Sequence, residues 1–186
     1  MDLQYILDNY TKTLCGKIFK YTVHNKTKNL YDELTIRFYN ENLCHLLGLQ
    51  HVYENSKKHL GESGYELIKN GKITVKSLKQ HNEKGYNFIK IKLKHFDEIY
   101  DIITTGKLIK FRQENCYPRT YITADFILIK DNVTYILHLF LRKESESNNI
   151  YSPVSFIVHT EKDKHYLQYI SNQTYKKISS FEEMNI

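Results

Sequence analysis

The sequence predicts an α+β fold, with N-terminal helices and a small hairpin packed on a C-terminal antiparallel β-meander of four to five strands. Residues 121–160 contain three apolar runs rich in Ile, Val, Phe and Tyr, separated by polar breaks, as is typical of strands. Residues 2–15 and 86–103 instead carry apolar side chains at helical spacing. The length of 186 residues suits a single domain, mainly helical with a hairpin over 1–106 and a sheet over 107–180.

The chain begins with an amphipathic helix over residues 2–15, whose apolar stripe consists of Leu3, Ile6, Leu7, Tyr10 and Leu14. The runs 17–23 and 34–39 predict the two strands of a hairpin, and the polar segment 25–29 connects them.

Four more helices are expected before the sheet. A short one follows Asn40 and ends at Gly48, because glycine readily takes the left-handed conformation of a helix C-terminus. Ser63 is a suitable N-cap for a second, over residues 64–70, and Thr74 for a third, over residues 75–80. The stripe of residues 86–103 predicts one long helix.

The apolar runs of residues 121–160 predict a hairpin followed by a third strand, and a last strand is expected over 174–178. Asp131 and Asn132 tolerate the conformations of a tight turn, and a turn centred between them places Asp125 opposite His138. Because side chains alternate along a strand, one face of this sheet is then apolar. The other face presents polar side chains, namely Tyr121, Thr123, Asp125, His138, Arg142 and Ser155.

Composition favours a basic cytoplasmic protein that binds a polyanion. The net charge is +6 and the isoelectric point is near 9.0, which favours attraction to phosphates. The three cysteines, Cys15, Cys44 and Cys116, have no metal-like spacing and are expected to be reduced thiols. No apolar stretch is long enough for a membrane span, and the N-terminus lacks a signal-peptide pattern.

The sequence lacks the common nucleotide-binding, zinc-protease and serine-hydrolase motifs, so we expect no cofactor or metal. Cleavage of RNA by acid/base chemistry fits a basic protein of this kind, with histidine as the proton carrier. Asp125 opposite His138 could fix the histidine tautomer, or the pair could be an ordinary cross-strand ion pair. A triad with Ser155 stays open. His45 lies among apolar residues and is either functional or a core histidine.

Several short motifs, taken in order, resemble a known family. They are IRFY at 36–39, NLCHLLGL at 42–49, KIT at 72–74 followed by Ser77, TADFI at 123–127, LFL at 139–141 and YSPVSF at 151–156. This order resembles the phage-associated nuclease-like group named after barnase, EndoU, colicin and RelE, particularly its fourth subfamily. The resemblance implies helices packed on an antiparallel meander, and it favours a functional role for His45 in an HLxGL-like motif. Lys92 stands where an Arg is expected.

Residues and resemblance together predict a metal-independent endoribonuclease of toxin or phage/mobile-element type. The candidate catalytic residues are His45, His138, Asp125 and Ser155, and the candidate substrate-binding residues are Tyr121, Arg142, Lys92 and Arg119. The histidines would act as acid and base, oriented by the aspartate. The serine and tyrosine would hold a phosphate or ribose, and the basic side chains would stabilise negative charge.

Two other functions stay open on the sequence. The first is a non-catalytic RNA- or protein-binding module on the same fold, such as a phage anti-defence factor. The second is a structural or assembly protein, for which the charge of +6 is only composition. RNA is the expected partner, with a protein antitoxin or a host defence protein as further candidates.

Overall fold

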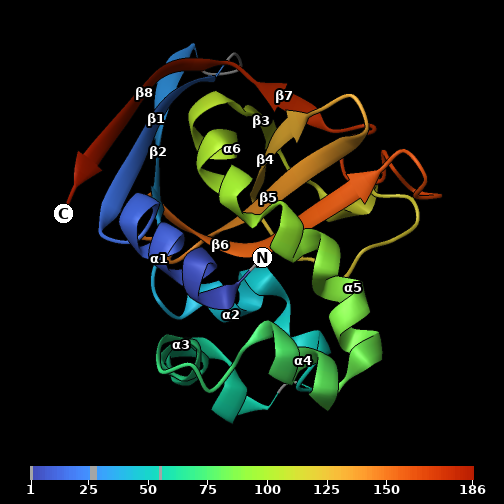
Figure 1. Cartoon of the computed structure of the whole chain (residues 1–186). Coiled ribbons are helices and arrows are strands. Elements are labelled where there is room, and N and C mark those ends of the chain that lie inside the picture. The colour runs from blue at the N-terminus through green and yellow to red at the C-terminus, as the bar shows by residue number, and fades with distance from the viewer. Residues whose placement is uncertain (1, 26–28, 55) are drawn as a thin grey trace. The chain divides into compact units, whose positions relative to one another are not determined.

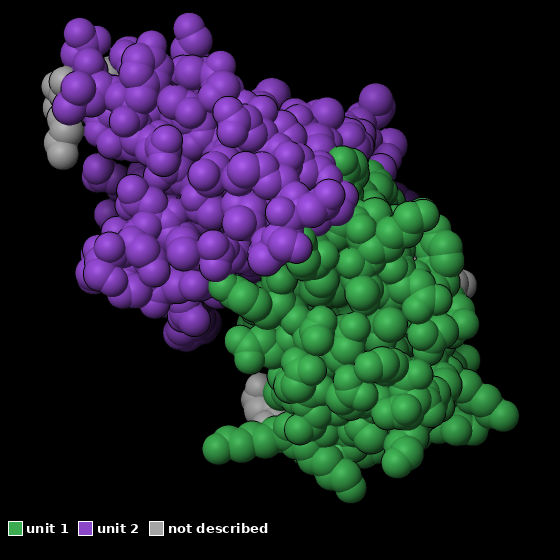
Figure 2. Space-filling model, turned by 90° about the vertical axis from the view of Figure 1, so that its left-hand side faces the viewer, with its two compact units in different colours: residues 1–16, 38–100 green, residues 17–37, 101–186 purple. Residues whose placement is uncertain are grey.

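The structure is a computed structural model, and it describes residues 2–25, 29–54 and 56–186. The chain forms two compact units, which Figure 2 colours separately. We call residues 1–16 with 38–100 the helical unit, and residues 17–37 with 101–186 the sheet unit. The mixed α+β class with N-terminal helices is confirmed (Figure 1).

The sheet unit contains a single sheet, whose described strands number eight (Figure 1). They are β1 Lys17–Asn25, β2 Leu30–Arg37, β3 Lys107–Lys110, β4 Phe126–Asp131, β5 Tyr135–Lys143, β6 Ile150–Thr160, β7 Thr174–Lys176 and β8 Ile178–Asn185. Their spatial order is β7-β3-β4-β5-β6-β2-β1-β8. The predicted meander of four to five strands is therefore too small, and the N-terminal hairpin is part of the same sheet. Its connector at 26–28 lies outside the described residues.

The sheet is mixed rather than antiparallel throughout. Six of its neighbouring pairs are antiparallel across the described strands, whereas β2 runs parallel to β6. The end strands β7 and β8 are separated along the chain by Lys177 alone, so the chain itself nearly closes the sheet. The His24 amide donates to the Lys177 carbonyl at 3.1 Å across this junction. Distant pairings of this kind leave no local pattern in the sequence.

The predicted register of β4 and β5 is wrong by four residues. His138 lies opposite Ile129 instead of Asp125, and Asp131 pairs with Ile136. The turn is centred between Val133 and Thr134, two residues later than predicted, and is closed by a hydrogen bond of 2.9 Å from the Asn132 amide to the Tyr135 carbonyl. Because the shift is an even number of residues, each side chain keeps the face that alternation predicts.

The face that carries His138 is nevertheless a hydrophobic core and not a polar surface. Its buried members are Ile109, Phe111, Cys116, Ile127, Ile129, Ile136, Phe140 and Tyr169. The opposite face is also buried, including Leu108, Leu128, Leu137, Leu139 and Leu141. The sheet is thus covered on both sides along its central strands, which explains why their apolar runs are nearly continuous.

The final strand, β8, was not predicted beyond Ile178. It has few apolar residues, and it is held by its pairing with β1 and by Phe181, whose ring lies 6.4 Å from that of Phe19 and 5.2 Å from that of Tyr21. An edge strand of this kind is specified by its partner more than by its own pattern.

The helical unit contains α1 Leu3–Thr13, α2 Asn42–Leu47, the 3-10 turns η1 Leu49–His51 and η2 Lys57–His59, α3 Gly61–Lys69, α4 Val75–His81, α5 Glu83–Lys94 and η3 Phe96–Glu98. Two local predictions are confirmed in detail. The buried residues of α1 are the predicted stripe, and Thr74 forms a capping box with Ser77 at the start of α4. No helix within the described residues has the length and apolar character needed to cross a membrane.

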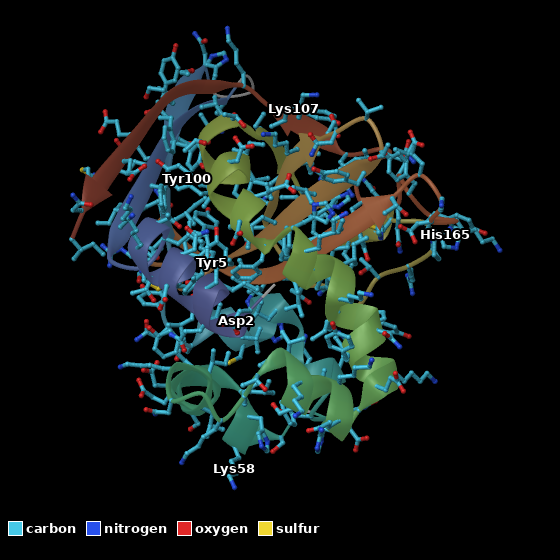
Figure 3. The ribbon with its side chains drawn as sticks, in the orientation of Figure 1. Asp2, Tyr5, Lys58, Tyr100, Lys107 and His165 are labelled. Atoms are coloured by element: carbon cyan, nitrogen blue, oxygen red, sulfur yellow. The ribbon has the colours of Figure 1, made fainter. Side chains whose placement is uncertain are left out.

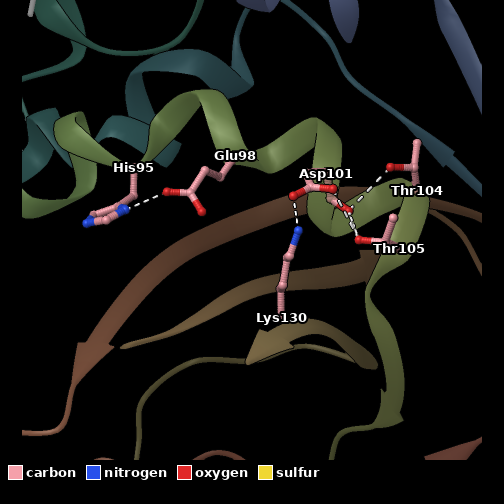
Figure 4. A network of polar contacts seen from close by, with 6 residues as sticks. All are labelled: His95, Glu98, Asp101, Thr104, Thr105 and Lys130. Carbon is pink, nitrogen blue, oxygen red and sulfur yellow. Dashed lines mark hydrogen bonds and ion pairs between the residues drawn. The ribbon is translucent and has the colours of Figure 1, made fainter. Parts of the chain in front are cut away.

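The predicted long helix over 86–103 is interrupted at His95. It is divided into α5, η3 and α6 Ile99–Thr105. His95 has a non-helical backbone, and its Nδ1 lies 2.6 Å from Glu98 Oε1 across the turn (Figure 4). The apolar stripe continues through Phe96 and Ile99, both buried, so periodicity alone could not reveal the interruption.

Within the sheet unit, polar contacts attach α6 to the strands. Lys130 of β4 pairs with Asp101 of α6, whereas the Thr105 hydroxyl donates to the Asp101 carbonyl at 2.8 Å within the helix itself (Figure 4). The buried Tyr21 hydroxyl donates to the Ile103 carbonyl at 2.6 Å.

Candidate active site

The predicted site residues are divided between the two units. His45 and Lys92 belong to the helical unit. The sheet unit holds the other six, namely Arg119, Tyr121, Asp125, His138, Arg142 and Ser155. Each group is therefore described in its own unit.

His138 is in the core of the sheet unit, where its side chain is fully buried. The ring lies 5.2 Å from that of His159 and 5.4 Å from that of Tyr169. Nδ1 is 3.4 Å from the Ile157 carbonyl, and no described residue gives Nε2 a hydrogen-bond partner. Burial, with a smaller effect of His159, lowers the pKa of His138 to about 3. This imidazole is neutral and enclosed at neutral pH, which is a poor setting for exchanging protons with a substrate.

Asp125 does not contact His138, and the predicted pair is wrong both as a catalytic pair and as an ion pair. Its Oδ2 accepts a hydrogen bond of 2.8 Å from the Lys143 amide. Oδ1 lies 3.8 Å from Lys110 Nζ, which sits over the Phe126 ring at 4.5 Å from its centroid. The carboxylate thus fastens the end of the β4–β5 hairpin, and β4 begins only at the next residue instead of at 121.

The remaining predicted residues of the sheet unit differ in exposure. Ser155 is half-buried opposite Phe140, on the His138 face and beside a bulge in β5–β6. Arg119 and Arg142 are exposed, and Tyr121 is fully exposed, at 101%. The sheet unit therefore brings Ser155 and His138 to one buried face and leaves the aromatic and basic candidates outside it.

In the helical unit, the end of α2 gathers a different set of groups. The segment His45-Leu46-Leu47-Gly48-Leu49-Gln50-His51 places one histidine three residues before Gly48 and another three residues after it. Both histidine side chains are exposed, so the core-histidine alternative for His45 is wrong. Leu46, Leu47 and Leu49 are fully buried and fix the turn to the unit.

Gly48 is required at this turn for two reasons. It ends α2 in the left-handed conformation with φ of 84°, which side chains other than glycine rarely adopt. A Cβ atom here would also lie 2.9 Å from Ile89 Cγ2 of α5. The same position is 3.5 Å from His51 Cδ2 and 3.6 Å from Lys92 Cδ, so the turn brings His51 and Lys92 together.

The electrostatics of this site favour a neutral histidine beside a cation. Burial lowers the pKa of Lys92, which is 7% exposed, to about 8. Burial also lowers the pKa of His51, and the positive charges of Lys92 and His45 lower it further. Exposed Phe88 adds an aromatic ring 4.5 Å from that of His51. A proton acceptor, a second imidazole and an ammonium group are thus assembled around one glycine turn.

His51 was not among the predicted site residues. The available signal was its placement, since it mirrors His45 about Gly48 in a stretch whose other residues are apolar apart from Gln50. Its proximity to Lys92, 41 positions later in the chain by their numbers, is a tertiary contact.

A comparison with models of protein families shows to which family the chain belongs. The sequence model described as phage-Barnase-EndoU-ColicinE5/D-RelE like nuclease4 matches residues 2–184. The chain belongs to this family. Comparisons with curated proteins and with solved structures gave no match.

Membership in this phage-associated nuclease-like family confirms the resemblance seen in the motifs and covers nearly all of both units. The family name indicates nucleic acid as the class of substrate. The motif that resembles HLxGL is the His45–Gly48 turn itself. Among the described residues, no group of three His, Cys, Asp or Glu side chains could hold a metal ion.

Proposed function

We propose that this nuclease-family member is a metal-independent endoribonuclease and that the Gly48 turn carries its chemistry. His51 is the general base, His45 the general acid and Lys92 the cation that stabilises the pentavalent phosphorus. The observation behind the proposal is the meeting of His45, His51 and Lys92 around a glycine that tolerates no side chain. His45 and Gly48 belong to the stretch that resembles HLxGL.

The reaction would proceed by transfer of the phosphate within the RNA. A ring nitrogen of His51 takes the proton of a 2′-hydroxyl, and O2′ attacks the adjacent phosphorus. The bond from phosphorus to O5′ breaks as His45 donates a proton to that oxygen. The products are a 2′,3′-cyclic phosphate and a 5′-hydroxyl. A base must be neutral to act, and the lowered pKa of His51 provides this at neutral pH.

Lys92 suits the role of charge stabiliser because it is partly withdrawn from water. An ammonium group in a low-dielectric setting interacts more strongly with developing negative charge than a solvated one. With a pKa of about 8, it is still mostly protonated at pH 7. The roles first expected of His138 and Asp125 pass to residues of the helical unit, and the toxin or mobile-element setting remains part of the proposal.

The test is cleavage of a mixed RNA pool in EDTA by the full chain and by the single variants His45→Ala and His51→Ala. His24→Ala, on β1 of the sheet unit, is the matched control. We expect cyclic phosphate ends, a loss of at least about 100-fold for either site variant, since general acid/base catalysis typically contributes that much, and no loss for the control.

Two results would overturn the proposal. RNA that stays intact but binds in a salt-sensitive way would identify a binding module without catalysis. Cleavage that persists in both histidine variants would place the chemistry elsewhere in the chain.

A further inference from the structure

An exposed row of aromatic and cationic side chains lies in the sheet unit, in the segment between β3 and β4. We call residues 112–121 the tyrosine loop. Tyr117 is 88% exposed and Tyr121 is 101% exposed, and Arg119 between them is exposed as well. Most large aromatic side chains of this chain are buried or half-buried, so two almost fully exposed tyrosines four positions apart need an explanation.

The residues between the exposed ones anchor the loop to the unit. Cys116 and Thr120 are buried. The Pro118 carbonyl accepts a hydrogen bond of 2.6 Å from Gln168 Nε2, and the Thr120 carbonyl accepts one of 2.6 Å from Gln113 Nε2. Every second residue is therefore held inward while its neighbours point outward.

A second segment, residues 161–173, supports the loop from the side. Gln173 exchanges two hydrogen bonds of 2.9 Å with the backbone of Arg112, and Asn115 Nδ2 donates to the Asn172 carbonyl at 2.7 Å. His165 points away from the sheet into solvent on this segment (Figure 3). The tyrosines thus stand on a loop that is braced at several points, so little conformational entropy remains to be lost when a ligand stacks on them.

We infer that the tyrosine loop is a stacking platform for unpaired bases of single-stranded RNA. Base stacking on exposed aromatic rings, with cations on the phosphates, is how proteins hold single strands without reading a duplex. Arg119 is the only charged residue among positions 115–124, so no carboxylate interrupts the row.

The inference rests on the proposed function for RNA as the substrate, and it adds the strandedness of that substrate and the surface that holds it. Bases in an A-form duplex are stacked on each other and their edges lie in a deep, narrow groove. A protruding loop with two tyrosines would gain little from such a duplex. The platform therefore makes unpaired stretches of RNA the preferred substrate of this protein.

The experiment measures binding in a His45→Ala/His51→Ala background, in which the RNA stays intact. Fluorescence anisotropy gives the affinity for a labelled single-stranded 12-mer and for a labelled hairpin of the same composition, whose strands are joined by a non-nucleotide linker so that every base is paired. We expect the single strand to bind more tightly, and Tyr117→Ala/Tyr121→Ala to weaken its binding by roughly 10- to 100-fold while leaving hairpin binding unchanged. Tyr117→Phe/Tyr121→Phe should bind normally, because stacking needs the ring and not the hydroxyl.

Tyr5→Ala is the matched control, since Tyr5 is an exposed tyrosine of α1 outside the loop (Figure 3). Equal binding of single strand and hairpin, or no effect of the double alanine change, would overturn the inference. An alanine variant that loses a protein partner but keeps its RNA affinity would overturn it as well.

The two proposals can be refuted separately. If RNA binding depends on the tyrosines but the chain never cleaves RNA, only the endoribonuclease proposal is refuted. If the chain cleaves RNA and the tyrosine variants bind it as tightly as the original chain, only the stacking platform is refuted.

Discussion

Lowering the pH should destabilise the sheet unit through His138. Its side chain is fully buried and its pKa falls from 6.5 to about 3. Between these two values the unfolded chain binds a proton that the folded chain excludes, so stability is complete above pH 6.5 and declines below it. One pKa unit corresponds to 1.36 kcal/mol, and a pH of 5 lies about 1.5 units below the ordinary histidine value. The expected loss between pH 7 and pH 5 is therefore about 2 kcal/mol from this residue.

The assay is urea unfolding at pH 7 and pH 5, followed by circular dichroism, for the original chain and for His138→Leu. Leucine fits an apolar site and removes the Nε2 atom that has no described partner. The difference in unfolding free energy between the two chains should change by about 2 kcal/mol between the two pH values, in favour of leucine at pH 5. The unfolding free energy of the His138→Leu variant should still decrease somewhat from pH 7 to pH 5, because burial also lowers the pKa of neighbouring His159.

Ile129→Val is the matched control, since it changes the buried residue opposite His138 without removing a titrating group and should leave the pH dependence unchanged. If the difference between the His138→Leu variant and the original chain were the same at both pH values, His138 would not be buried in its neutral form and the reasoning would fail.

Three further predictions follow from the helical unit and the hairpin. Gly48→Ala should lower the free energy of unfolding by roughly 2–4 kcal/mol, because the new Cβ atom would lie 2.9 Å from Ile89 Cγ2 in a backbone already in the left-handed conformation. Gly71→Ala, at φ of 67° with open space around it, should lower it by only about 1 kcal/mol in the same thermal melts. Equal losses for the two variants would contradict the clash. The rate of RNA cleavage should fall on the acid side below pH 6.5, as His51 is protonated, and on the alkaline side as the proposed acid His45 loses its proton and, above about pH 8, as Lys92 loses its own. Lys92→Arg should remove only the loss of rate above about pH 8, and an unchanged profile in that range would remove Lys92 from the site. Asp125→Ala should destabilise the chain by about 1–2 kcal/mol, because it leaves the amide at the end of β5 without its acceptor; Asp125→Asn keeps an acceptor oxygen and should cost less in urea melts.

Local rules predicted the elements whose signals are contained in a few residues. The stripe of α1, the Thr74 capping box and the Gly48 helix end are all decided within one or two turns of chain. The same rules gave the correct face of every residue in β4 and β5, because alternation survives an even shift of register.

The errors came from features decided at long range. The turn between β4 and β5 lies two residues later than predicted, since the side chains around Asn132 do not by themselves fix its centre. That shift removed Asp125 from His138, and the second layer of core over the sheet buried His138. The contact of His51 with the side chains around Lys92 depends on how α5 packs against the Gly48 turn, which no spacing in the sequence reports.

The pairing of β1 with β8 has a consequence for how the protein is made. Lys17 lies opposite Asn185, so β1 leaves the ribosome well before the strand with which it pairs, 168 positions later by their numbers. The helical unit, in contrast, has all of its residues available once position 100 has been synthesised. Contacts between distant parts of a chain also form slowly. Until translation reaches β8, β1 carries an unpaired edge, and the nascent sheet unit is the part of this protein that a chaperone would have to protect.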